Sequence, residues 1–195
     1  LQIVKNHFKP QEDRVIRGTE QIVGNIMLQT YDAAFFLELI KILFDDTKTL
    51  KIESIYSLNF KEELIKKIQE FSKDSDFKNS FLKFCFANDA RLFNQEDFLS
   101  LVINSIGISS DEMLSLITDP KVQERSLYSL SRFFTESSIN VVSQAFSNDE
   151  LEFADDKNIQ SIRNWMSHYN RDLALLWQQK FLDNGYKFSE LLYSD

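Results

Sequence analysis

The residue types that carry most enzyme chemistry are scarce in this sequence. It has two histidines, His7 and His168, and one cysteine, Cys85, so a zinc site built from these residue types lacks ligands. Cys85 stands between two phenylalanines, and an apolar setting opposes the thiolate that a catalytic nucleophile needs. Adjacent acids such as Asp155 and Asp156 lack the spacing of a calcium loop. We therefore expect a buried cysteine, no metal and no cofactor.

One short motif contains residues that could act on a phosphate. Arg163 is followed directly by Asn164 and, five positions after the arginine, by His168. Histidine can move a proton near neutral pH, and arginine can neutralise phosphate charge. On one uninterrupted helix, side chains five positions apart diverge by about 140°. Arg163 and His168 can therefore meet only if a helix begins between them or a second protomer supplies one of them.

This motif resembles the R-x4-6-H motif of HEPN-type proteins. The resemblance implies an all-α, commonly dimeric bundle and a metal-independent ribonuclease. Arg163 and His168 would then act on the scissile phosphate, with Asn164 as the polar neighbour that the family favours. The competing interpretation is an arginine and a histidine on the outer faces of an apolar helix. We keep the ribonuclease as the alternative hypothesis, with RNA as a partner only in that case.

Apolar residues recur at helical spacing along almost the whole chain, which predicts an all-α fold. The four glycines and two prolines are too few for a fold of many short strands, and the scattered glycines form no phosphate-binding loop. We expect seven to eight helices in an irregular multi-helix bundle or a short α-helical stack. The expected organisation is one domain over residues 1–195, with residues 1–18 as a candidate flexible arm. Residues 1–8 and 49–58 are weak candidates for strands.

Local capping signals predict where several helices begin and end. Helix starts are predicted at Asn59 with Glu62, Asn94, Ser109 with Glu112, Asp119-Pro120, and Ser137 or Ser138. Helix ends are predicted at Gly107 and at Asn184-Gly185. The densely apolar run from Ala33 to Phe44 predicts a core helix. A further helix is expected to start at Asp119 and to carry apolar residues from Val122 to Phe134. The longest periodic segment, Ile159 to Leu176, predicts one continuous helix with acidic residues near its start. Those acids favour helix capping, with an acidic docking patch as the alternative.

The net charge of −8 opposes binding to nucleic acid or to an anionic membrane. No apolar span reaches 18 residues and no signal-peptide pattern begins the chain, so a cytoplasmic location without membrane contact is expected. Trp165 and Trp177 fall on one side of the predicted long helix, where they belong to the core or, if exposed, to a partner-binding face. The candidate partner-binding residues are Trp165, Trp177, Tyr186, Phe188 and Tyr193. We predict a protein–protein interaction module (adaptor, chaperone-like or effector domain) without catalytic activity; a structural segment of a larger chain is a third interpretation.

Overall fold

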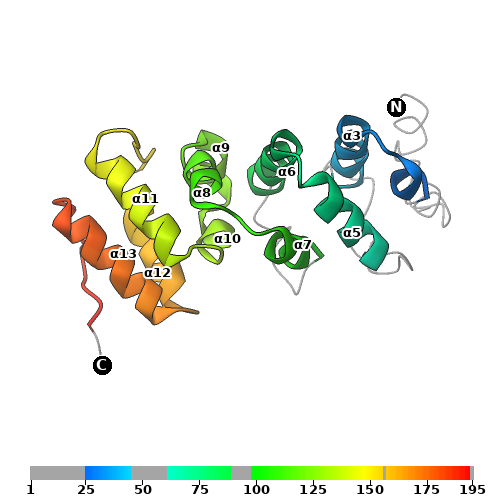
Figure 1. The fold of residues 1–195 in the computed structure, drawn as a ribbon. Coiled ribbons are helices and arrows are strands. Elements are labelled where there is room, and N and C mark those ends of the chain that lie inside the picture. Colours follow the sequence, from blue (N-terminus) through cyan, green and yellow to red (C-terminus); the bar gives the residue numbers. More distant parts are fainter. Residues whose placement is uncertain (1–24, 45–60, 89–97, 156, 194–195) are drawn as a thin grey trace, which may run out of the picture. The chain divides into compact units, whose positions relative to one another are not determined.

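The fold is all-helical, as the periodicity predicts. A computed structural model describes residues 25–44, 61–88, 98–155 and 157–193, and within these ranges it contains no strand. Eight of the described helices have at least seven residues (Figure 1). The candidate strands, the candidate arm and the caps at Asn59 and Asn94 lie outside the described residues.

The contacts divide the chain into two compact units. The first lies within Leu1–Phe84 and Glu96–Ile106, and the second within Cys85–Gln95 and Gly107–Asp195. The single-domain organisation stays a prediction.

The first unit is built around phenylalanine rings. Its helices are α3 (Ala33–Phe44), α5 (Lys61–Phe71), most of α6 (Ser75–Asn88) and α7 (Phe98–Ile106), with a short helix over residues 25–29. Phe36 of α3 is fully buried, and its ring centroid lies 4.9 Å from that of Phe71. Phe77 lies 5.5 Å from Phe71 and 6.1 Å from Phe81, so the rings form one continuous cluster. Such aromatic contacts add to the free energy gained by burying the rings.

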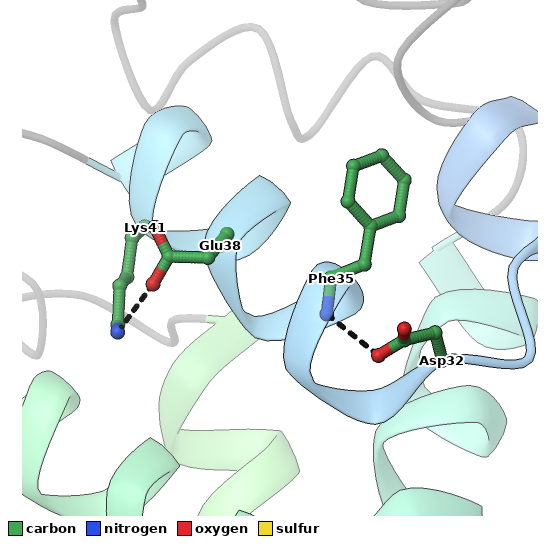
Figure 2. A network of polar contacts seen from close by, with 4 residues as sticks. All are labelled: Asp32, Phe35, Glu38 and Lys41. Carbon is green, nitrogen blue, oxygen red and sulfur yellow. Dashed lines mark hydrogen bonds and ion pairs between the residues drawn. The ribbon is translucent and has the colours of Figure 1, made fainter.

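Helix α3 begins directly after a cap at Asp32, which precedes the apolar run of the sequence. The Asp32 carboxylate accepts a hydrogen bond of 3.0 Å from the backbone N–H of Phe35, as Figure 2 shows. This bond satisfies one of the first four N–H groups, which have no partner inside the helix. One turn further on, Glu38 and Lys41 form an ion pair of 2.7 Å on the outer face.

The second unit contains six helices after the end of α6. They are α8 (Ser110–Ile117), α9 (Pro120–Arg125), α10 (Leu127–Ser131), α11 (Glu136–Ser147), α12 (Lys157–Ser167) and α13 (Arg171–Asp183). Helix α11 packs against α8 and α13, and α12 packs against α10 and α13. Trp177 is fully buried at the centre, with its ring centroid 4.4 Å from Phe181 and 5.2 Å from Phe134.

Several boundary predictions are confirmed. Ser109 and Glu112 form a capping box at the start of α8, and Asp119 caps α9 with Pro120 in its first turn. Gly107 has a φ of 68° directly after α7, and that left-handed conformation favours glycine. The carboxylate of Asp155 accepts a hydrogen bond of 2.8 Å from the N–H of Lys157, which supports the capping interpretation of that acid.

Three boundary predictions are wrong. The helix expected from Asp119 onward is two helices, because the chain leaves helical geometry at Ser126, whose hydroxyl donates to the carbonyl of Phe86. The cap of α11 is Thr135; Ser138 sits three residues later and completes the capping box. The expected continuous helix from Ile159 to Leu176 is divided between α12 and α13.

Candidate functional site

The break between α12 and α13 separates the two tryptophans that the sequence placed on one helix face. Asn170 starts α13 by accepting a hydrogen bond of 3.1 Å from the N–H of Leu173. Trp177 lies in the core, where its indole N–H donates to the carbonyl of Ile159 at 3.0 Å. Trp165 is half-buried, with its ring edge-to-face against Tyr128 at 5.7 Å. Of the two, only Trp165 has surface that a partner could reach.

Arg163 is 2% exposed, and hydrogen bonds hold its guanidinium on several sides. Nε and Nη2 donate to Oδ1 of Asn164 at 3.1 and 2.7 Å. Nη1 donates to Oε1 of Gln178 at 2.8 Å and to the carbonyl of Glu190. The guanidinium carbon lies 4.7 Å from the ring centroid of Phe188, so the cation also contacts the aromatic face.

His168 lies in the turn after α12 and is exposed. Its backbone N–H donates to the carbonyl of Trp165 at 3.2 Å. The two members of the R-x4-6-H motif therefore differ in burial: His168 is exposed, whereas Arg163 is buried and bonded to protein acceptors. A phosphate would have to displace those acceptors, so this arrangement favours a structural role for Arg163. The ribonuclease stays a prediction.

Residues 186–193, here called the tail, run back along α12 and α13 after the turn at Gly185. In Figure 1 the tail is the red segment that continues from the end of α13. Gly185 has a φ of 84°, the left-handed conformation that lets the chain reverse after a helix.

Side chains of α12 and α13 hold the tail mainly by its backbone. Gln160 accepts from the N–H of Ser189 at 3.0 Å and donates to its hydroxyl at 2.5 Å. The amide of Gln178 accepts from the N–H of Leu192 at 2.8 Å and donates to the carbonyl of the same residue at 2.9 Å. Arg171 donates to the carbonyl of Tyr193 at 2.6 Å. We call these side chains, together with Arg163, the tail-binding face: Gln160, Arg163, Arg171 and Gln178.

The charge of Arg163 is balanced by polar and aromatic groups. The bonded acceptors are an amide oxygen of Asn164, an amide oxygen of Gln178 and a backbone carbonyl. Burial lowers the pKa of the guanidinium, while the nearby Glu190 and Tyr186 act in the opposite direction. An arginine remains protonated under such conditions because its ordinary pKa is so high. The tail-binding face thus presents one desolvated positive charge.

The tail supplies three of the five candidate partner-binding residues. Phe188 is half-buried and packs edge-to-face with Tyr186 at a centroid distance of 4.8 Å. Tyr193 is 72% exposed, and Leu191 is 43% exposed. Tyr186 and Phe188 therefore belong to the contact between the tail and the helices, whereas most of the Tyr193 side chain faces solvent.

Sequence reasoning missed Gln160, Arg171 and Gln178. Glutamine is a common surface residue, and its bonds here join positions 14 to 29 apart in the chain. Neither helical periodicity nor a short motif indicates such a pairing. The one available signal was Gln178, a polar residue within the apolar part of a periodic segment.

Other groups that could carry chemistry give weaker support for a functional site than the tail-binding face does. Cys85 is fully buried, as predicted, and burial raises the pKa of its thiol. Among the described residues, no three His, Cys, Asp or Glu side chains come together as a metal-ligand group. A surface hollow of about 410 Å³ is lined by Phe146, Ser147, Asp149, Leu151, Glu152 and Asn184. Its two carboxylates belong to exposed residues.

Comparison with known proteins finds no family model, no curated sequence and no solved structure that matches this chain. Within the part of the chain that the structure describes, no helix is long and apolar enough to cross a membrane.

Proposed function

We propose that this chain is a protein-interaction module that binds an extended segment of a partner protein on its tail-binding face. The observation that carries the proposal is the set of side chains on α12 and α13 that bond to the backbone of the tail. In this proposal the module has no catalytic activity and acts in the cytoplasm.

Because the tail-binding face bonds to the backbone of the tail, it can also bind segments that have a different sequence. Every extended polypeptide offers the same N–H and C=O groups, so affinity can come from the backbone and selectivity from a few side chains. The paired bonds from Gln178 to the N–H and C=O of Leu192 are of this kind. Gln160 adds a further bond to a backbone N–H at Ser189.

The burial of two polar side chains of the face also supports the proposal. Its side chains project from two packed helices, and Arg163 and Gln178 are 2% and 7% exposed. Buried polar groups need partners, since an unsatisfied one costs roughly 1–3 kcal/mol. When the tail leaves, Arg163 loses the carbonyl of Glu190 and Gln178 loses both of its partners at Leu192, and water or a second segment would replace these groups.

A peptide-binding measurement on a full chain with a weakened tail tests this function. In the open-tail variant, Phe188→Ser removes the ring at Arg163, and Leu192→Pro removes the N–H that bonds to Gln178. The probe is a fluorescein-labelled peptide with the sequence of residues 186–193. We expect saturable binding by fluorescence anisotropy and a loss of binding when Gln178→Leu is added.

The matched control in the same background is Gln179→Leu, because Gln179 is exposed and bonds to Asp183 at 2.7 Å on the same helix. This control should bind the peptide like its parent. An open-tail variant with a native circular dichroism spectrum that binds no peptide would overturn the proposal.

A further inference from the structure

Two residues of the tail contact the buried guanidinium of Arg163, one through its ring and the other through its backbone. The ring of Phe188 lies over the cation at 4.7 Å. Two positions later, the backbone carbonyl of Glu190 accepts a hydrogen bond from Nη1, and the negative charge of Glu190 raises the pKa of this guanidinium against the larger, lowering effect of burial. Ser189, between them, faces Gln160. The ring of an aromatic residue and, two positions later, the backbone of an acidic residue therefore contact the same cation.

The bonded acceptors around Arg163 leave its charge without an ion pair. Within the described ranges, the structure records one ion pair, between Glu38 and Lys41. The guanidinium of Arg163 bonds to amide and carbonyl oxygens, and hydrogen bonds from a cation to a carboxylate are stronger than those. A segment that brings a carboxylate closer than the exposed Glu190 does would gain such a bond.

We propose that the partner of the tail-binding face is an extended segment in which an aromatic residue is followed two positions later by an acidic residue, and that the tail occupies the face until this segment displaces it. The inference rests on the function proposed above and names the chemistry of its partner. The chain's own example of this pattern is Phe188-Ser189-Glu190.

The tail is suited to being displaced. Leu191 is 43% exposed and Tyr193 is 72% exposed, so much of its apolar surface stays in water. Most of its bonds to the helices are polar contacts that water or a second segment can replace. Segments held mainly by such polar contacts open locally, without unfolding the rest of the domain. While the tail is bound, the apparent dissociation constant for a partner rises in inverse proportion to the open fraction.

The test compares the wild-type chain and the open-tail variant with three labelled peptides. One peptide has the sequence of residues 186–193, the second carries Glu190→Gln and the third carries Phe188→Leu. For the open-tail variant we expect the glutamine peptide to bind about threefold more weakly, which is typical of an exposed charge pair. The leucine peptide should bind about fivefold more weakly, because it lacks the aromatic face. The effect of Glu190→Gln should disappear at 1 M salt, where charge interactions are screened.

The wild-type chain should bind the first peptide about tenfold or more weakly than the open-tail variant does, because its tail competes. Equal binding of the three peptides to the open-tail variant would overturn the aromatic-and-acid pattern while leaving the proposed function in place. Equal affinity of wild type and open-tail variant would overturn the competition by the tail. Absence of binding to a folded open-tail variant would instead refute the proposed function itself.

Discussion

Replacing Gln178 with leucine should release the tail without unfolding the domain. Gln178 is 7% exposed, and leucine is close to it in size, so the packing of α13 against α12 is preserved. The substitution removes both bonds to Leu192, of 2.8 and 2.9 Å. It also removes the Gln178 acceptor of Arg163, a bond that joins α12 to α13 and does not involve the tail.

The expected size of the effect follows from the two lost bonds. A hydrogen bond within a protein contributes a net of about 1 kcal/mol to stability. Losing both should favour the open tail by about 2 kcal/mol, which corresponds to about a 30-fold larger open fraction.

Trypsin measures that fraction by cleaving after Lys187, because Ser189 and Leu192, which follow the cleaved bond, are bonded to α12 and α13 while the tail is bound. When opening is fast relative to cleavage, the cleavage rate follows the open population. Mass spectrometry of the released C-terminal fragment should therefore show about 30-fold faster cleavage in Gln178→Leu than in wild type. Gln179→Leu should be cleaved at the wild-type rate. A wild-type rate in Gln178→Leu would refute the role of this side chain in holding the tail.

Other substitutions test the core, the caps and the ionisable groups. Trp177→Phe should lower the free energy of unfolding by about 3 kcal/mol in a urea titration, while Trp165→Phe, at a half-buried position, should cost less than about 1 kcal/mol; equal costs would contradict the assigned core. Ser109→Ala should cost about 1 kcal/mol by the same assay, because it removes a capping box. Gly185→Ala should also cost about 1 kcal/mol, because alanine is strained at a φ of 84°, and an unchanged stability would argue against this turn. Desolvation raises the pKa of Tyr169 to about 12, so this phenol binds its proton more tightly in the folded chain than in the unfolded one; because the side chain is 43% exposed, solvent screening keeps the effect on stability small. Its contribution to stability is present below pH 10 and is lost between pH 10 and 12, and Tyr169→Phe should remove that part of the pH dependence measured by urea unfolding.

The parts of the fold that could be predicted from the sequence depend on local signals. The capping box of Ser109 and Glu112 joins residues three positions apart, and the positive φ at Gly107 concerns one residue. Helical periodicity also repeats every few residues, so the all-α class and the core helix from Ala33 to Phe44 follow from the sequence.

The break between α12 and α13 could not be predicted from periodicity. Both helices turn an apolar face toward the same core, so the apolar spacing continues through the turn at His168. Asn170 was the available signal, because an asparagine before a charged first turn is a common helix cap.

The tail-binding face could not be predicted from the sequence for a different reason. Its bonds connect glutamine and arginine side chains to backbone groups, and a backbone group has no residue type to recognise. The sequence did point to Arg163, Phe188 and Tyr186, but it gave the arginine a role on phosphate only in the alternative hypothesis, otherwise placed it on an outer helix face, and assigned the aromatics to a separate surface. The structure places all three in one contact region.

The most direct measurement of the central claim is a nuclear magnetic resonance titration of the ¹⁵N-labelled open-tail variant with the unlabelled peptide of residues 186–193. The account predicts saturable shifts of the side-chain amide signals of Gln160 and Gln178 toward their positions in the wild-type chain. Peptide binding that leaves both signals unchanged, or that shifts residues of the first unit instead, would contradict it.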